Sequence, residues 1–194
     1  MKRSEKFRII SQETERLINE FCKLNKIKAP KISYEFKDKL GGTTYYSETK
    51  NLGYYQIYSK TIHVIFGNSE LNSEKSFIAG LEDNTIHGTL LHEFGHFVRF
   101  NTNIDWDSFP NGIRTISNYE RRSKDWDETV AETFRLYIGN PHLLSIWNPA
   151  RFKWMSEHFK RVRNTSWDKT LFNLGVRQDR IKSLKILLKK KNLI

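Results

Sequence analysis

The sequence of 194 residues has few cysteines and no long apolar runs. It contains a single cysteine, Cys22, so the chain can form no internal disulfide bond and no cysteine-rich metal cluster. It has no stretch long enough to span a bilayer, and its charged start, MKRSEKFRIISQETERL, lacks the apolar core of a signal peptide. We therefore expect a chain that is made and kept in the cytoplasm, with export that needs no signal peptide as the alternative.

Acidic residues are scarce at the C-terminal end. Residues 151–194 hold 13 Lys or Arg and 3 Asp or Glu, a balance of +10, which leaves +1 of the total +11 for residues 1–150. The last segment, 176–194, places apolar residues in helical register between lysines and predicts a basic amphipathic helix appended to one domain at 1–175. Such a helix can dock on its own domain, lie on an anionic membrane, or bind nucleic acid through phosphates.

The rest of the chain alternates between helical and strand patterns. Apolar residues at helical spacing predict an N-terminal helix at 4–26, and β-branched and aromatic runs predict strands at 31–36, 43–48, 54–59 and 61–66. Further helices are expected at 85–96, from residue 126, and from residue 140 with proline interruptions at 141 and 149, and a loop is expected at 101–118. The fold class is therefore α+β, with a small mixed or antiparallel sheet.

The segment NTIHGTLLHEFGHFVRF, residues 84–100, carries two histidines four residues apart. On a helix, His92 and His96 lie about 40° apart, and Glu93 lies about 60° from His96, so the three polar groups share one face. Apolar side chains occupy the opposite face. Two imidazoles at this spacing can bind one Zn²⁺, while the glutamate can reach a metal-bound water without being a ligand. The alternative is an amphipathic helix that carries this combination by chance, which is rare.

Two further residues of this segment have structural interpretations. Gly95 lies in the helix interior, where glycine costs roughly 1 kcal/mol, so its presence indicates that backbone or ligand approaches closely there. His87 falls on the apolar side of the helix. We interpret His87 as a structural histidine with a hydrogen-bond partner, separate from the polar cluster.

A zinc ion held by two histidines needs another protein ligand, commonly a carboxylate from a later helix. The segment DWDETVAETFRLYIGNP, residues 125–141, offers Glu128 and Glu132, about 40° apart on one helix face. An ordinary solvated acidic face is the alternative. Because a structural zinc site would normally need four protein ligands, and few soft ones are present, the sequence favours an open catalytic site with three ligands.

The two motifs together resemble a known family. HEFGHFVRF followed by ETVAETFRLYIGNP is similar to the zinc peptidase domain of anthrax lethal factor and its relatives, which include phage and mobile-element proteins. The resemblance covers about residues 60–160. It implies a zincin-like fold in which a small mixed sheet packs on the HExxH helix and a Glu-bearing helix. It also implies that His92, His96 and Glu128 bind the metal, that Glu93 is the general base, and that Glu132 orients a ligand.

That family also has a tyrosine before the glutamate helix that stabilises the transition state. The segment TISNYERRSKDWDE offers Tyr119, nine residues before Glu128, a slightly longer spacing than in the family. The resemblance implies that the Tyr119 hydroxyl donates to the oxyanion. An exposed loop tyrosine without a role is the alternative.

The function implied is that of a zinc-dependent endopeptidase, with a protein or peptide substrate and Zn²⁺ as the cofactor. The strand at 61–66 could pair with an extended substrate by strand addition. The alternative function is that of a zincin-fold binding protein, associated with nucleic acid or a virion, whose basic C-terminal tail is the working part. With either function, we expect the protein to be cytoplasmic, carried in a phage particle, or exported without a signal peptide.

Overall fold

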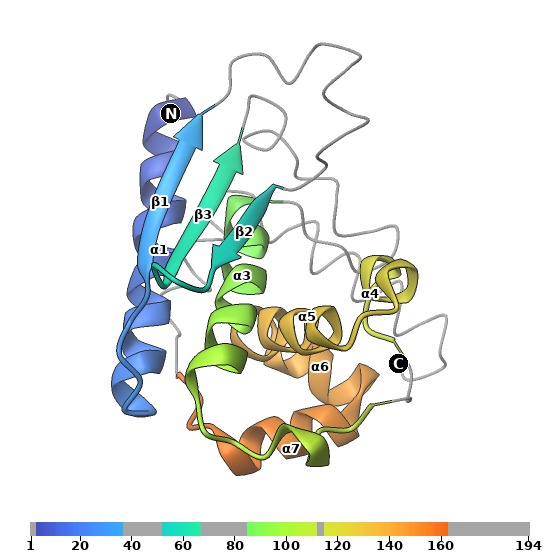
Figure 1. The fold of residues 1–194 in the computed structure, drawn as a ribbon. Coiled ribbons are helices and arrows are strands. Elements are labelled where there is room, and N and C mark those ends of the chain that lie inside the picture. The colour runs from blue at the N-terminus through green and yellow to red at the C-terminus, as the bar shows by residue number, and fades with distance from the viewer. Residues whose placement is uncertain (1–2, 37–51, 67–84, 112–114, 163–194) are drawn as a thin grey trace.

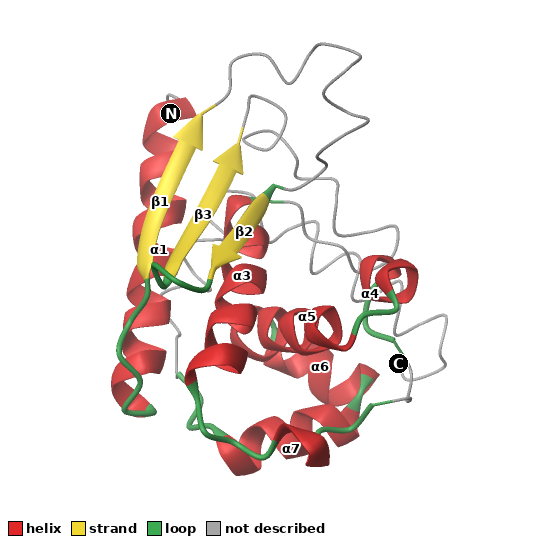
Figure 2. Cartoon of the chain, in the orientation of Figure 1, coloured by secondary structure: helices red, strands yellow, loops and turns green. Residues whose placement is uncertain are grey.

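The computed structural model describes residues 3–36, 52–66, 85–111 and 115–162 (Figure 1). Helices make up most of this part of the chain and one small sheet completes it, which agrees with the predicted α+β class (Figure 2). No helix there is both long and apolar enough to cross a membrane. In chain order the elements are α1 (Arg3–Leu24), β1 (Lys31–Phe36), β2 (Gly53–Gln56), β3 (Thr61–Phe66), α3 (Ile86–Asn101), the short 3₁₀ helix η1 (Trp106–Ser108), α4 (Asn118–Ser123), α5 (Trp126–Gly139), α6 (Pro141–Trp147) and α7 (Pro149–His158).

The three strands form a mixed sheet in the order β1-β3-β2. β1 runs parallel to β3, with Lys31 opposite Thr61, and β2 runs antiparallel to β3, with Gly53 opposite Val64. The predicted strand 61–66 is therefore confirmed in its bounds, but it lies at the centre of the sheet. Because β3 is paired on both sides, its backbone cannot accept an added substrate strand, and the expectation that it would do so is wrong.

One face of the sheet packs on helices. Along β1 and β3 buried or half-buried residues alternate with more exposed ones, as expected for strands with one covered face. Figure 1 shows α1 and α3 side by side behind the sheet, with α5, α6 and α7 at one end of it. Phe21 of α1 contacts Phe94 of α3 and Phe134 of α5, with ring centroids 5.5 and 6.0 Å apart. These aromatic contacts join α1 and α3 to α5, and the three rings belong to one core with Ile62 and Val64 of β3.

Helices α3 and α5 pack very closely because α3 has a glycine where they meet. A Cβ atom built on Gly95 would lie only 2.6 Å from the Cα atom of Ala131 and 3.0 Å from its carbonyl oxygen. A side chain at residue 95 would therefore force the helices apart. The predicted close approach at Gly95 is confirmed, and the approaching group is the backbone of the glutamate helix.

Local capping determines where the helices begin. The Thr85 side chain accepts a hydrogen bond from the backbone N–H of Gly88, and the Asp125 side chain accepts one from Asp127, so α3 and α5 start directly after these residues. The prolines at 141 and 149 were expected to interrupt helices. They are instead the first residues of α6 and α7, where a proline needs no backbone donor.

The structure corrects the predicted bounds of β2 and supports the predicted placement of His87. The strand predicted at 54–59 is shorter, since β2 ends at Gln56 and the chain turns before β3. His87 is buried, and its Nδ1 atom lies 3.0 Å from the Thr14 hydroxyl of α1, which confirms its hydrogen-bonded structural placement. The strand predicted at 43–48 and the helix predicted at 176–194 lie outside the described residues.

Candidate metal centre

The crossing of α3 and α5 brings three candidate ligands together. His92 and His96 lie on consecutive turns of α3, and Glu128 lies in the first turn of α5. The Nε2 atoms of His92 and His96 lie 2.9 and 3.5 Å from the same Oε2 atom of Glu128. One ligand atom from each residue lies within 4.8 Å of the other two, so the group can hold a metal ion. The three residues predicted as ligands therefore meet at one point.

Through its Nδ1 atom, His92 contacts a buried ion pair formed by Glu132 and Arg135. Its Nδ1 atom lies 2.8 Å from Oε1 of Glu132, one turn along α5 from Glu128. Arg135 in turn donates two hydrogen bonds to Glu132, at 3.0 Å from Nε and 2.7 Å from Nη2. Glu132 and Arg135 are both buried. Glu132 thus contacts a candidate ligand and does not itself face the group of three.

The contact between His92 and Glu128 requires a proton or a metal ion between the two facing atoms. When the ring is neutral and its proton is on Nδ1, which faces the Glu132 carboxylate, Nε2 presents a lone pair toward Glu128. A lone pair and a carboxylate oxygen 2.9 Å apart repel unless a proton or a metal ion binds them both. The Glu128 Oε2 atom is buried, and no donor in the described part of the chain meets it in hydrogen-bond geometry. Two imidazole nitrogens and one carboxylate are a ligand set typical of catalytic zinc.

Without a metal ion a proton on His92 takes this place, as the pKa values of the group show. Burial lowers the pKa of His92, but the Glu128 and Glu132 carboxylates outweigh it and raise this pKa to about 10. Burial alone would raise the pKa of Glu128, yet the two histidines lower it to about 2. The pKa of Glu132 is likewise well below its usual range, because Arg135 and His92 outweigh its burial. Glu128 and Glu132 are therefore both ionised at neutral pH, as expected for a metal ligand and for a carboxylate that hydrogen-bonds to a histidine ligand.

Glu93 is buried beside the histidines and has a different environment. Burial raises the pKa of its carboxyl, while the two histidines and a hydrogen bond from the Tyr55 backbone of β2 oppose this shift. β2 approaches closely because Gly53 has no side chain: a Cβ atom there would lie 3.0 Å from Cγ of Glu93 and 2.8 Å from the Thr89 methyl. A buried carboxylate with a raised pKa next to a metal site has the properties of a general base.

Tyr119 lies at the edge of the same group. It comes from α4, and its ring lies 5.5 Å from the His92 ring, at an interplanar angle of 81°. Burial and the nearby carboxylates of Glu128 and Glu93 raise the pKa of its hydroxyl, which therefore stays protonated. The side chain remains 39% exposed. The tyrosine therefore lies on a helix beside the candidate ligands, with a proton to donate and with its side chain partly exposed.

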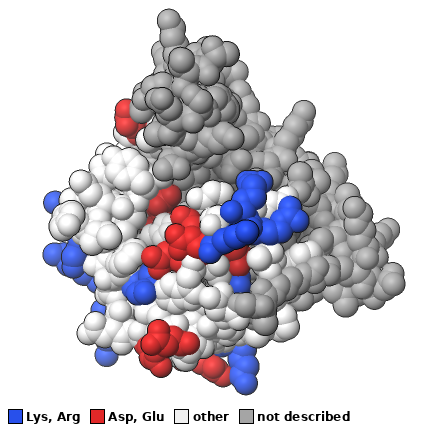
Figure 3. Space-filling model, turned by 45° about the vertical axis from the view of Figure 1, so that its right-hand side comes forward, with Lys and Arg blue, Asp and Glu red and all other residues white. Residues whose placement is uncertain are grey.

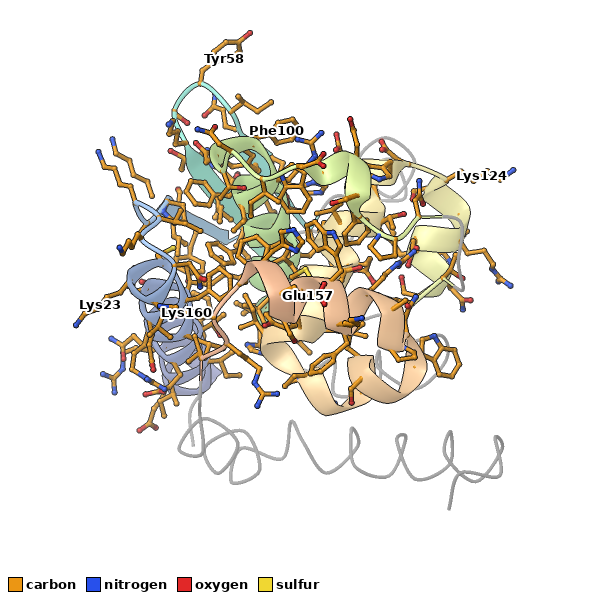
Figure 4. All side chains as sticks on the ribbon, turned by 90° about the horizontal axis from the view of Figure 1, so that it is seen from below. Lys23, Tyr58, Phe100, Lys124, Glu157 and Lys160 are labelled. Carbon is orange, nitrogen blue, oxygen red and sulfur yellow. The ribbon has the colours of Figure 1, made fainter. Side chains whose placement is uncertain are left out.

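Basic side chains surround the outer end of α4. Arg121, Arg122 and Lys124 are exposed, and Figure 3 shows Lys and Arg side chains beside an acidic group on one face of the molecule. Figure 4 shows Lys124 pointing away from the body of the protein at the end of α4. The same view shows Tyr58 projecting from the turn between β2 and β3, where it is fully exposed.

Three residues of the site were not anticipated from the sequence. Arg135 resembled one more polar residue on a helix, and Gly53 and Tyr55 belong to a strand far from both motifs in the sequence. The spacing of Glu132 and Arg135, three residues apart on a helix, was the one available signal. Comparison with known protein families, with curated proteins and with solved structures found no match to this chain.

Proposed function

We propose that this protein is a zinc-dependent endopeptidase. The observation that carries the proposal is the convergence of His92, His96 and Glu128 on one point, with the carboxylate of Glu93 buried beside it. Three protein ligands would leave one coordination position of a bound zinc ion for a water or substrate oxygen, as in catalytic zinc sites. The resemblance of both motifs to the zinc peptidase domain of anthrax lethal factor supports the same function and the zincin-like fold.

The chemistry is divided among the residues of the site. A bound Zn²⁺ would act as a Lewis acid, lowering the pKa of a water molecule and polarising the scissile carbonyl. Glu93 accepts the proton of the attacking water and passes it to the leaving amine. Tyr119 donates a hydrogen bond to the oxyanion that develops on the substrate, an interaction strongest in the transition state. Glu132 keeps the proton on His92 Nδ1, which leaves Nε2 free to bind the metal.

The free edge of β2 lies next to Glu93, and we expect an extended substrate to pair with it. β2 is paired only with β3, and its other edge carries no strand in the described part of the chain. The Tyr55 backbone already reaches Glu93, so a peptide added along β2 would pass the general base. The expected strand addition is therefore assigned to β2. Backbone pairing of this kind selects extended peptides with little dependence on their sequence.

The alternative function is that of a zincin-fold binding protein that binds its partner through the basic C-terminal tail. A body that served only as a scaffold would have no need for two buried carboxylates aligned with two histidines, because burying such charges costs free energy. The complete ligand set with its base therefore favours the enzyme. Binding of a nucleic acid or another polyanion by the tail is compatible with catalysis.

The deciding experiment compares the full-length protein with Glu93→Gln and His96→Ala. We expect the wild type and Glu93→Gln to retain one zinc per chain after dialysis, and His96→Ala to lose it. Only the wild type should cleave a proteome-derived peptide library, because Glu93→Gln removes the base and preserves the ligands. Absence of cleavage by zinc-loaded wild type, or equal cleavage by Glu93→Gln, would refute the proposed function.

A further inference from the structure

The helix that carries Tyr119, α4, is too short to fix its own orientation. α4 has six residues, fewer than an isolated helix needs for stability in water. The side chain of Ser117 caps its start by accepting the Glu120 N–H at 3.1 Å. Its direction must therefore be set by contacts with the rest of the protein.

One buried ion pair supplies the main contact. The Glu120 side chain turns into the core, and its Oε1 atom accepts a hydrogen bond from Arg151 of α7 at 2.8 Å. Glu120 is 3% exposed and Arg151 is 1% exposed. The other carboxylate oxygen, Oε2, accepts the backbone N–H of Ile116 at 2.6 Å. A single carboxylate therefore connects α7, α4 and the segment that precedes α4.

Arg151 extends the connection to the loop after α3. Its Nε atom donates to the carbonyl oxygen of Pro110 at 3.2 Å, and its guanidinium lies 5.7 Å from the centre of the Phe109 ring. Near the same place, Trp147 of α6 donates from its indole nitrogen to the carbonyl of Thr115 at 3.0 Å. Both ends of the loop that leads to α4 are thus attached to α6 and α7.

The free-energy cost of burying the charges of Glu120 and Arg151 indicates that this ion pair has a role other than stabilising the fold. Burying two charges is often no more stabilising than filling the same space with apolar side chains, whereas an ion pair fixes direction through its hydrogen bonds. Glu120 directly follows Tyr119, and neighbouring residues of a helix point about 100° apart. Holding Glu120 in the core therefore fixes the rotation of α4 and directs Tyr119 toward His92, which its ring contacts at 5.5 Å.

We propose that Glu120 and Arg151 form a positioning pair that holds the Tyr119 hydroxyl in place for hydrolysis. This inference rests on the proposed peptidase function. Neither residue touches the metal ligands; both act through the orientation of α4. A displacement of about 1 Å at a reacting group can cost up to a hundredfold in rate, so a loosened α4 should slow the chemical step.

The variant to test this removes both buried charges together. Glu120→Gln/Arg151→Met leaves no unpaired charge in the core, so it should fold and bind one zinc per chain. We expect its kcat to fall by roughly tenfold or more while KM changes little, because the lost interaction acts in the transition state. Tyr137→Phe is the matched control, because it removes a different buried hydrogen bond, from Tyr137 to the Phe159 carbonyl at 2.9 Å, without touching α4.

A double-mutant cycle with Tyr119→Phe distinguishes positioning from general loosening. If the pair acts through the Tyr119 hydroxyl, adding Glu120→Gln/Arg151→Met to Tyr119→Phe should leave kcat at the value measured for Tyr119→Phe alone. An equal fall in kcat in both backgrounds would overturn the proposal, as would wild-type kcat in the folded Glu120→Gln/Arg151→Met variant.

A second measurement does not depend on activity. In NMR spectra of the full-length protein, with zinc removed by a chelator, we expect nuclear Overhauser effects between the ring protons of Tyr119 and His92. They should persist in Tyr137→Phe and disappear in Glu120→Gln/Arg151→Met. Their persistence in the latter would overturn the proposal. If the wild type proved inactive on peptides, the proposed function would fail, and this measurement would still decide whether the pair positions Tyr119.

Discussion

Glu132 lies directly behind His92, with its Oε1 atom 2.8 Å from the Nδ1 atom of the imidazole. Glu128, from the preceding turn of the same helix, approaches the other nitrogen of this ring at 2.9 Å. One helix therefore supplies both the carboxylate that meets the two histidines of the candidate metal centre and the carboxylate that contacts His92 at its other ring nitrogen. Arg135, three residues further along, keeps Glu132 ionised.

From this relationship we expect Glu132→Gln to weaken zinc binding by about tenfold to a hundredfold, the usual effect of losing a group that orients a metal-bound histidine. Competition with a chromophoric chelator measures the affinity. Glu157→Gln is the control, since Glu157 is an exposed carboxylate on α7. Equal zinc affinity for the two variants would mean that Glu132 has no part in orienting His92.

The Tyr119 hydroxyl should contribute to the rate and not to metal binding. We expect Tyr119→Phe to lower kcat by on the order of a hundredfold, because the substrate oxyanion loses a donor, while zinc content stays at one per chain. Steady-state kinetics on a cleaved peptide, together with metal analysis, make the comparison. Unchanged kcat, or loss of zinc from this variant, would contradict the role assigned to Tyr119.

The helical part of the site could be predicted because periodicity encodes it. An apolar face opposite His92, His96 and Glu93 determines both which side of α3 is buried and which residues gather on the other side. The same holds for Glu128 and Glu132 on α5. Their meeting could not be derived from either helix alone, because it depends on the crossing at Gly95, which the sequence indicated only as a close approach.

The contribution of the sheet could not be predicted in the same way. Strand bounds follow from local composition, but strand order depends on pairing between segments distant in sequence, and no pattern in residues 61–66 distinguishes a central strand from an edge strand. For the same reason the contacts of Gly53 and Tyr55 with the region of Glu93 were not foreseen. Buried ion pairs such as Glu120 with Arg151 join residues 31 positions apart and leave no local signal.

The basic C-terminal segment should be separable from catalysis. We expect removal of residues 176–194 to preserve zinc binding and cleavage of a short peptide, because the balance of +10 is concentrated in residues 151–194 and the metal ligands lie elsewhere. Binding to DNA, RNA or anionic vesicles should weaken, and nucleic-acid binding should show steep salt dependence. Full-length protein with Lys182, Lys185, Lys189 and Lys190 changed to Gln is the control for charge. Equal polyanion binding by all three proteins would show that the segment is only a solvated basic face.

Cys22 should make folding stability depend on pH in the alkaline range. Burial raises the pKa of its thiol from 9.0 to about 12. Between these values the unfolded chain releases the thiol proton and the folded chain keeps it, so the free energy of unfolding falls as the pH rises through this window. Urea unfolding at pH 8 and pH 10 should show a larger fall for the wild type than for Cys22→Ala. Equal falls in the two proteins would mean that the thiol ionises as readily in the folded chain as in the unfolded one.

The close crossing of α3 and α5 predicts that Gly95→Ala damages both stability and metal binding. Helix propensity alone would favour alanine by roughly 1 kcal/mol. The added Cβ would lie 2.6 Å from the Ala131 Cα atom, and backbone cannot move aside as a side chain can, so we expect a net loss of about 1–3 kcal/mol in the free energy of unfolding. Zinc affinity should fall as well, because His96 adjoins Gly95 on α3 and Glu128 lies one turn from Ala131 on α5.

Gly139→Ala is the matched control for this prediction, since it adds the same atom near the end of α5. There the new Cβ atom would meet only side-chain atoms, Cδ1 of Leu91 at 3.1 Å and Nε2 of His87 at 3.3 Å, which need to give way by only a few tenths of an ångström. Chemical denaturation and chelator competition on both variants test the expectation. If Gly95→Ala were as stable as Gly139→Ala and bound zinc equally well, the two helices could not cross as closely as the metal centre requires.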